Sequence, residues 1–216
     1  MAGGGAVDAG PAVRLYRAEW STNCERVGLA LAYKGIAAQS ILIEYSNRQP
    51  VIAISGQPLV PVIEDAGQVI NDSVSIMRHL ERRTPDPPLF PTDRARAAEV
   101  DLFIDWFERV YKEPPNAIEA ELGNEKPDED RIAKLSAAMR ERLDVFERLL
   151  EGRDYLFGEF GAADCVAYPF LKYAAGRDPA DDETFHVILT EHQPLGKEHK
   201  NLRAWIERMA ERPRAY

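Results

Sequence analysis

A proline stands inside what otherwise reads as a β-strand, in the segment Leu59-Val60-Pro61-Val62-Ile63-Glu64. Proline has no N–H group to donate to a sheet, so it belongs at the start of a strand, at an edge or at a bulge. The Val60-Pro61 bond is a candidate for the cis form, which folded proteins keep where a tight turn requires it. About ten residues later, Asp72-Ser73 opens a segment with helical periodicity and has the residue types of a helix N-terminus. Together they predict an exposed strand edge beside a helix N-terminus, which suits the binding of a small peptide-like anion.

The apolar pattern of residues 13–83 predicts a small α/β domain. The expected elements are a strand at 13–16, a helix at 25–34 closed by Gly35, a strand at 40–43, a hairpin of 59–64 and 68–70 around Asp65-Ala66-Gly67, and a helix at 73–83. The order strand, helix, strand, hairpin and helix is typical of a thioredoxin-like domain. The residues before it, 1–12, are rich in Gly and Ala and are expected to form a disordered tail.

Four prolines between Thr84 and Thr92 cannot be helical, and they predict a semi-rigid linker over 84–92. No strand pattern follows this linker, so residues 93–216 are expected to form an all-helical domain. The expected helices cover 93–111, ended by Pro114-Pro115, and then 130–150, 161–173 and 201–209. Residues 176–200 show little periodicity and are expected to form a solvated loop. The three histidines in it, His186, His192 and His199, match no metal-ligand spacing.

Charge and composition exclude several classes of function. The net charge is −9, and residues 84–216 hold 19 Lys and Arg against 28 Asp and Glu. An acidic domain argues against nucleic acid as a partner, because phosphate backbones require a basic face. No stretch approaches the ~20 apolar residues of a membrane-spanning helix. The two cysteines lie far apart in the sequence, which favours a reducing cytoplasm over a disulfide framework.

Three segments together resemble the signatures of the glutathione-transferase superfamily: Ser21-Thr22-Asn23-Cys24-Glu25-Arg26-Val27, Val60-Pro61 and Asp72-Ser73. The resemblance extends from about residue 13 to the C-terminus. It implies a thioredoxin-like glutathione-binding domain followed by a helical domain, in a cytoplasmic homodimer. It also implies reduced glutathione as co-substrate, a small hydrophobic electrophile as second substrate, and no metal. Two features depart from the family pattern: Asp72 replaces the more usual Glu, and the loop 46–58 lacks the usual Asn-Pro.

Ser21 lies just after a predicted strand and just before a predicted helix. A thiol bound there would meet the partial positive charge of the helix N-terminus and a hydroxyl donor, and both stabilise a thiolate. Lowering a thiol pKa from about 8.5 by ~2 units requires only ~2.7 kcal/mol. In serine-type members of the superfamily this residue holds the thiolate, so the resemblance gives Ser21 the catalytic role. A plain helix cap is the structural alternative, and Thr22 is the rival donor.

Cys24 follows Ser21 by three residues, where redox proteins of the wider fold have Cys-x-x-Cys. A serine at the first position excludes dithiol chemistry. The expected state of Cys24 is buried and inert, although a helix N-terminus can lower a cysteine pKa enough for monothiol chemistry.

The resemblance distributes the remaining glutathione contacts over four residues. Val60 would pair through its backbone with the cysteinyl part, as an added strand does, with the Pro61 bond leaving its polar groups free. Asp72 would hold the γ-glutamyl ammonium, and Ser73 with the helix N-terminus would hold its carboxylate. In the loop that departs from the family pattern, either Gln57 or Arg48 is expected to meet the glycyl carboxylate.

The second substrate is expected against the first long helix of the helical domain. Tyr111 and Phe107 are the candidates for its pocket, Tyr111 first because its hydroxyl needs a partner. Trp106 is the third aromatic of this group. Asp101 or Asp105 is expected to reach across a dimer interface. Asp164 is interpreted as a structural capping residue, with Gly161 where the family usually has Ser or Thr.

Three alternatives to a transferase remain open on the sequence. The first is a glutathione-dependent isomerase or dehalogenase that uses the same activated thiol. The second is a non-catalytic module of the same fold that binds a protein. The third is a different low-molecular-weight thiol as the ligand.

Overall fold

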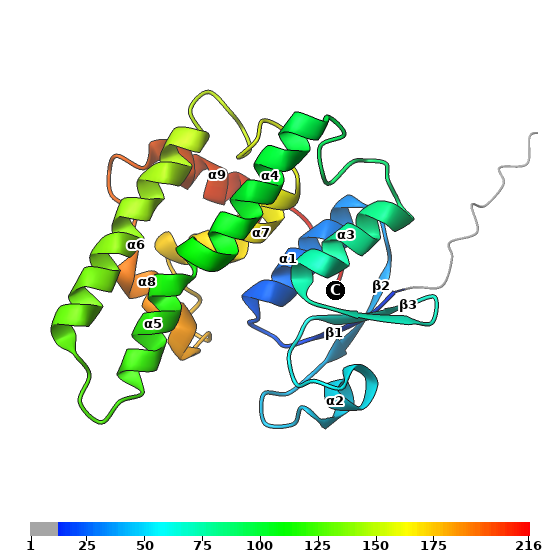
Figure 1. The fold of residues 1–216 in the computed structure, drawn as a ribbon, viewed down its shortest axis with the longest axis horizontal. Coiled ribbons are helices and arrows are strands. Elements are labelled where there is room, and N and C mark those ends of the chain that lie inside the picture. The colour runs from blue at the N-terminus through cyan, green and yellow to red at the C-terminus, as the bar shows by residue number, and fades with distance from the viewer. Residues whose placement is uncertain (1–12) are drawn as a thin grey trace, which may run out of the picture.

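The computed structural model describes residues 13–216, so the expectation for residues 1–12 lies outside the described residues. An N-terminal domain with a four-stranded sheet is followed by a helical C-terminal domain (Figure 1). The N-terminal elements are β1 (Val13–Arg17), α1 (Thr22–Tyr33), β2 (Ala38–Leu42), α2 (Gln49–Ser55), β3 (Val62–Asp65), β4 (Gln68–Asn71) and α3 (Ser73–Arg83). The predicted class, a thioredoxin-like α/β domain followed by an all-helical domain, is confirmed.

The sheet has the order β2-β1-β3-β4, with β1 parallel to β2 and β3 antiparallel to both β1 and β4. Leu15 lies opposite Ile63, and Tyr16 lies opposite Val62, so the two pairs face opposite sides of the sheet. Leu15 and Ile63 belong to the main core beneath α1 and α3, whereas Tyr16 and Val62 pack with Val51 of α2. Figure 1 shows α1 and α3 on one side of the sheet and α2 on the other.

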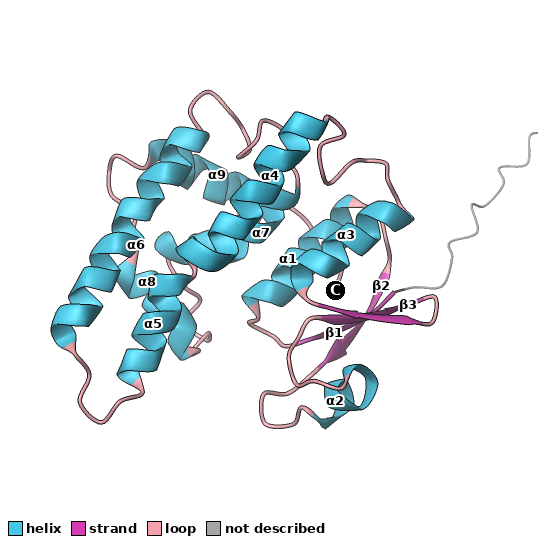
Figure 2. Ribbon diagram, viewed as in Figure 1, coloured by secondary structure: helices cyan, strands magenta, loops and turns pink. Residues whose placement is uncertain are grey.

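The C-terminal domain contains only helical elements among its described residues, and Figure 2 shows them as a bundle packed beside α1 and α3. They are α4 (Arg94–Trp106), a π-helical turn η1 (Phe107–Tyr111), α5 (Glu113–Leu122), α6 (Glu129–Leu149), α7 (Ala162–Leu171), a 3₁₀ turn η2 (Lys172–Ala174), α8 (Thr184–His192) and α9 (Lys200–Ala210). Every residue of α7 is buried, as its apolar sequence predicts, and α7 packs against α1.

The prediction of a loop over residues 46–58 is wrong, because α2 lies there. This helix has Pro50 in its first turn and ends at Gly56, whose φ of 74° is the left-handed conformation that glycine adopts freely. Both residues are ordinary signals for the ends of a helix, but seven residues are too few to show a clear period.

The prediction of one helix over 93–111 ended by Pro114-Pro115 is also wrong. The α-helix ends at Trp106, η1 follows it, and the two prolines lie in the first turn of α5. Proline is well accommodated in the first turn of a helix, where its missing N–H has no partner to lose. The two prolines therefore begin a helix instead of ending one.

Residues 176–200 are not a solvated loop. The segment contains α8, and the His186 and His199 side chains are buried. His186 Nδ1 lies 2.9 Å from the Asp181 carboxylate, and His199 Nε2 lies 3.1 Å from Asp144 Oδ1. Hydrogen-bonding partners of this kind offset the free-energy cost of burying a histidine ring, and the periodicity of the sequence does not indicate them.

Two cis peptide bonds are present among the described residues, at Val60-Pro61 and Asp86-Pro87. The first confirms the prediction made from the proline inside the strand pattern.

Asp164 is structural, as the sequence indicates. It is fully buried, and its carboxylate accepts hydrogen bonds from the backbone N–H of Leu156 at 3.0 Å and of Gly161 at 3.1 Å. The indole Nε1–H of Trp205 donates a third bond at 2.8 Å. The carboxylate thereby ties α7 to α9 and to the loop before α7.

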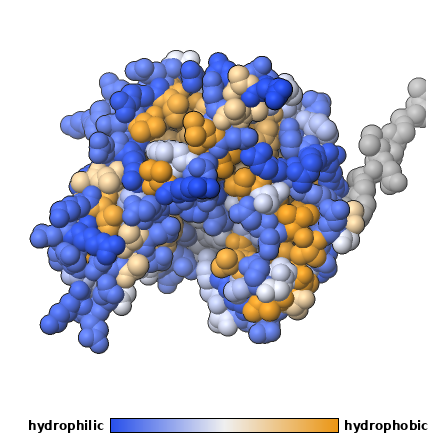
Figure 3. Space-filling model, in the orientation of Figure 1, coloured by the Kyte–Doolittle hydropathy of each residue, from blue (hydrophilic) through white to orange (hydrophobic). Residues whose placement is uncertain are grey.

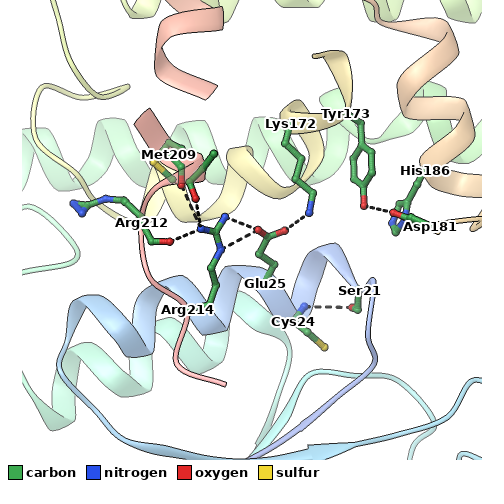
Figure 4. A network of polar contacts seen from close by, with 11 residues as sticks. Ser21, Cys24, Glu25, Lys172, Tyr173, Asp181, His186, Met209, Arg212 and Arg214 are labelled. Atoms are coloured by element: carbon green, nitrogen blue, oxygen red, sulfur yellow. Dashed lines mark hydrogen bonds and ion pairs between the residues drawn. The ribbon is translucent and has the colours of Figure 1, made fainter. Parts of the chain in front are cut away.

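The C-terminal residues return to the N-terminal domain. The Ala215 N–H donates to the Gly28 carbonyl at 3.1 Å, and the Tyr216 ring covers Gly28 so closely that a Cβ there would overlap it. Arg214 forms an ion pair with Glu25 of α1 at 2.7 Å, and Lys172 reaches the same carboxylate at 2.7 Å (Figure 4). The end of the chain therefore fastens α1 to the helical domain.

We expect the effect of Gly28→Ala on stability to depend on whether Tyr216 is present. Alanine at a helix interior gains up to ~1 kcal/mol over glycine, so the substitution should stabilise a Tyr216→Ala protein by about that amount. In the full chain, displacement of the Tyr216 ring should cancel or reverse the gain. Urea unfolding of the two single variants and the double variant measures this coupling, and equal effects in both backgrounds would show that the ring contact is immaterial.

Candidate functional site

A cleft of about 380 Å³ opens between the two domains. Figure 3 shows the molecule hollowed between its two lobes on this face. The lining residues come from α1, the loop between α2 and β3, the junction of β4 with α3, and the helical domain. They are Asn23, Gln57, Leu59, Val60, Pro61, Asn71, Asp72, Ser73, Glu108 and Lys112. All five residues predicted to bind glutathione line this one cleft, although they come from two separate segments of the sequence.

The N-terminus of α3 forms one wall of the cleft. Asp72 is its N-cap, and Asp72 Oδ1 accepts a hydrogen bond from the Ser75 N–H at 2.8 Å. The φ of Asp72 is 68°, a region that residues other than glycine seldom occupy and that is often found at functional sites. Ser73 is buried, and its Oγ accepts a hydrogen bond from Arg26 Nη1 at 3.3 Å. The Ser73 hydroxyl hydrogen is therefore available for a ligand.

Val60 and Gln57 play different parts in the loop between α2 and β3. No hydrogen bond to the Val60 backbone occurs within the described residues 13–216, so its N–H and C=O remain available. The Gln57 side chain, in contrast, holds the loop itself. Its amide accepts from the Leu59 N–H at 2.6 Å and donates to the Leu59 carbonyl at 3.0 Å and to Ser55 Oγ at 3.2 Å.

Ser21 lies next to the cleft but is not among its lining residues. It is the N-cap of α1, and its Oγ accepts a hydrogen bond from the Cys24 N–H at 3.3 Å (Figure 4). The side chain is half-buried, whereas that of Thr22 is buried. The Ser21 oxygen thus serves as a helix cap, and the Ser21 hydroxyl also interacts with the neighbouring Cys24 thiol.

Cys24 is 1% exposed. Burial raises the pKa of its thiol to about 11, although the Ser21 hydroxyl, the Ala18 backbone and the charges of Arg17 and Arg48 oppose the rise. The thiol therefore remains protonated at neutral pH, which agrees with the expectation that Cys24 is buried and inert. Arg17 and Arg48 therefore contribute positive charge at the start of α1.

Phe107 and Tyr111 do not line the cleft, and the prediction that they form a second-substrate pocket requires correction. Their side chains are 0% and 2% exposed, and their rings stack at 4.4 Å. The Tyr111 hydroxyl donates to Gln193 Oε1 at 2.5 Å, so the partner that this hydroxyl needs lies in the core. The sequence shows that both residues share a face but not which way that face points.

Two charged side chains of the helical domain reach the cleft instead. Glu108 and Lys112, which the sequence leaves unassigned, line the wall on this side. Glu108 lies within the π-helical turn η1, in which the Lys112 N–H donates to the Phe107 carbonyl at 3.1 Å, five residues back and not four.

A row of alternating charges leads from the core to this wall. Arg26 Nη1 lies 2.5 Å from Glu108 Oε1, and Glu108 Oε2 lies 2.9 Å from Lys112 Nζ. The Arg26 side chain is 1% exposed, donates from Nε to the Val166 carbonyl at 3.0 Å, and lies over the Phe170 ring. Burial lowers the pKa of Arg26 and of Lys112, while the Glu108 carboxylate opposes both shifts. Burial also acts to raise the pKa of Glu108, but the two cations outweigh it and the net shift is downward.

The two acidic residues expected at a dimer interface are paired within the chain. Asp101 lies 2.7 Å from Arg78, and Asp105 lies 2.7 Å from Arg109. Across the described part of the chain, no group of three or more His, Cys, Asp or Glu is placed to hold a metal ion. No helix within residues 13–216 is both long and apolar enough to cross a membrane.

Comparison with known proteins connects this architecture to one family. Residues 15–88 match the family model of the glutathione S-transferase N-terminal domain, and residues 100–213 match that of the C-terminal domain. The chain belongs to the glutathione S-transferase family. The glutathione S-transferase resemblance stated from three short segments is thereby confirmed, while the subclass is unresolved.

Individual members of the glutathione S-transferase family are similar to the chain over most of its length. Glutathione S-transferase Z1 of Arabidopsis thaliana is 33% identical over 185 residues, covering 82% of this chain and 83% of the relative. FtsZ-localized protein A of Caulobacter vibrioides is 29% identical over 159 residues, covering 68% and 70%. The crystal structure of poplar glutathione transferase F1 has a TM-score of 0.72 at 22% identity and covers 94% of both chains, which shows a shared fold.

Proposed function

We propose that this protein is a glutathione transferase that binds reduced glutathione in the cleft and directs its sulfur at a small electrophile. The observation that carries the proposal is the meeting of Val60, Asp72 and Ser73 in one cleft beside the N-terminus of α1. These groups offer a strand edge, an anion, a hydroxyl donor and a helix N-terminus, which match the peptide backbone and the charged γ-glutamyl end of the tripeptide.

The free polar groups of the cleft support a particular pose. The Val60 N–H and C=O would pair with the cysteinyl residue, and Asp72 would hold the γ-glutamyl ammonium. The Ser73 hydroxyl and the amides at the start of α3 would hold the adjacent carboxylate. For the glycyl carboxylate two candidates remain: Gln57 lines the cleft but its amide is engaged in its own loop, whereas Arg48 lies outside the lining but has an Nη1 that is buried without a partner among the described residues.

Ser21 would hold the glutathione sulfur as a thiolate. Its hydroxyl would turn from the Cys24 thiol to donate to the bound sulfur while its oxygen still caps α1, and the helix N-terminus would add partial positive charge. The charges of Arg17 and Arg48, which act to lower the Cys24 pKa, would act on a bound sulfur at this end of α1 in the same sense. No base is required, since these interactions need only shift the thiol pKa.

We expect Ser21→Ala to lower conjugation activity at pH 7 roughly tenfold to thirtyfold while leaving glutathione affinity within a few-fold. The loss reflects a thiolate that falls from a majority to a few per cent of the bound ligand when its pKa rises by ~2 units. Steady-state kinetics with a general aromatic electrophile and calorimetric titration of glutathione measure the two quantities. Thr22→Val is the matched control, and a larger loss in that variant would transfer the role to Thr22.

We also propose a homodimer. Leu102 on α4 and Val69 on β4 are 71% and 44% exposed, and a partner subunit would cover these apolar side chains. Sedimentation equilibrium distinguishes a dimer from a monomer directly.

A second candidate function is a non-catalytic module that binds a protein. Two observations favour it: Ser21 lies outside the cleft lining, and Leu59 at the mouth of the cleft is 73% exposed. Similarity to FtsZ-localized protein A shows that relatives with other names share this fold. If the protein is such a module, it should have no measurable affinity for glutathione. An isomerase or dehalogenase would keep the affinity and the dependence on Ser21, so substrate screening separates these from a transferase.

A further inference from the structure

We propose that Lys112 is a ligand-binding residue of the cleft, which binds the α-carboxylate at the γ-glutamyl end of the thiol ligand from the side of the helical domain. The inference rests on the proposed function, because it names a further contact with the same ligand. If Lys112 has this role, residues of both domains contact the γ-glutamyl end of the ligand. Lys112 then helps to determine which thiols the cleft binds.

The position of Lys112 is the first support. Lys112 and Glu108 line the same cleft as Asp72 and Ser73, although they follow them by more than thirty residues and belong to the other domain. Glu108 lies within the π-helical turn at Phe107–Tyr111, and Lys112 directly follows it. Turns of this kind inside helices are rare and occur frequently at functional sites.

The second support is the way in which the Lys112 ammonium is held. Glu108 is bound at both oxygens by different cations, Arg26 on the core side and Lys112 on the cleft side. The buried Arg26 fixes Glu108, and Glu108 in turn positions Lys112. An ammonium group has three donors, and the hydrogen bonds of the described residues use one of them, on Glu108. The row of alternating charges therefore ends in a cation with free donors at the cleft wall.

The charges of the cleft match an amino acid in its zwitterionic form. The α-carbon of a γ-glutamyl group carries an ammonium and a carboxylate side by side. Asp72 supplies the negative charge for the ammonium, and Lys112 supplies a positive charge for the carboxylate. The buried Ser73, whose Oγ already accepts from Arg26, contributes a hydroxyl donor. Charge-assisted hydrogen bonds of this kind are about twice as strong as neutral ones.

The test is calorimetric titration of two ligands into the wild type, Lys112→Met and Lys112→Arg. One ligand is reduced glutathione, and the other is 4-aminobutyryl-cysteinylglycine, which lacks only the α-carboxylate. We expect Lys112→Met to weaken glutathione binding about tenfold and to leave the affinity for the analogue unchanged within about twofold. Lys112→Arg should restore most of the glutathione affinity, since it keeps the charge.

A comparison of the two ligands on the wild type provides a check that involves no substitution. The wild type should bind glutathione about tenfold more tightly than the analogue. Equal weakening of both ligands by Lys112→Met would assign Lys112 a merely structural role and overturn the inference. Equal affinity of the wild type for the two ligands would also overturn it, while leaving glutathione binding intact. Failure of the wild type to bind glutathione at all would overturn the proposed function together with the inference.

Discussion

Arg26→Ala is expected to destabilise the folded protein by about 3–5 kcal/mol, because it removes a buried guanidinium that holds a partly exposed carboxylate and leaves a cavity in the core. The guanidinium donates to groups on three other elements: Ser73 of α3, Glu108 of η1 and the Val166 carbonyl of α7. Its loss leaves Glu108 with Lys112 alone and opens a cavity beside Phe170. Urea unfolding followed by circular dichroism measures the effect.

A double variant separates the ion pair from the packing. Arg26→Met fills most of the space but leaves the Glu108 charge without its buried partner, whereas Arg26→Met with Glu108→Gln removes both charges. We expect the double variant to recover at least half of the stability lost by Arg26→Met, because replacing a whole buried pair is often nearly neutral. A loss below about 1 kcal/mol for Arg26→Ala would show that this residue does not join the two domains.

Asp164→Ala is expected to cost about 3–5 kcal/mol at neutral pH. Two buried N–H groups, on Leu156 and Trp205, and the partly buried N–H of Gly161 would lose their acceptor, and each unsatisfied buried donor costs about 1–3 kcal/mol. The decisive variant is Asp164→Asn, which nearly keeps the shape but cannot ionise.

The pH dependence of that comparison has a definite sign. Burial raises the pKa of Asp164 to about 6, whereas an aspartate in an unfolded chain titrates near 3.9. As the pH falls from 7 to 4, the folded state takes up this proton first, so the wild type should gain roughly 2–3 kcal/mol relative to Asp164→Asn. Unfolding free energies at a series of pH values test this, and a constant difference between the two proteins would contradict the assigned pKa.

The N-terminal domain could be predicted from the sequence in some detail because its signals are local. Period-two alternation places Leu15 and Tyr16 on opposite faces of the sheet, and Asp72-Ser73 marks the start of α3 where it lies. The proline at 61 identifies both the cis bond and the loop that lines the cleft. Each of these rests on the conformational preferences of a few neighbouring residues.

The helical domain is harder to predict, because its errors come from tertiary contacts. His186 and His199 are buried by pairing with Asp181 and Asp144, which no periodicity discloses. The polar residues of 176–200 therefore predict a solvent-exposed loop where the structure has α8.

The candidate site was predicted on one side of the cleft only. The residues of the N-terminal domain were found because the family resemblance points to them. Glu108 and Lys112 are not predicted, because the aromatic character of Phe107 and Tyr111 points to those two residues, which in fact share the buried stripe of this helix. A charged pair spaced by four residues beside a fully buried aromatic pair is the one signal that could have indicated them.

The measurement that tests the central claim most directly is the pKa of the glutathione thiol when bound to the protein, followed by the ultraviolet absorbance of the thiolate. The wild type and Ser21→Gly are the proteins to compare, because glycine costs an N-cap only a few tenths of a kcal/mol and so removes the hydroxyl with little loss of stability. We predict a bound thiol pKa ~2 units below the free value of about 8.5 in the wild type, and a value near the free one in Ser21→Gly. A bound thiol that titrates near 8.5 in the wild type would contradict thiolate activation by Ser21.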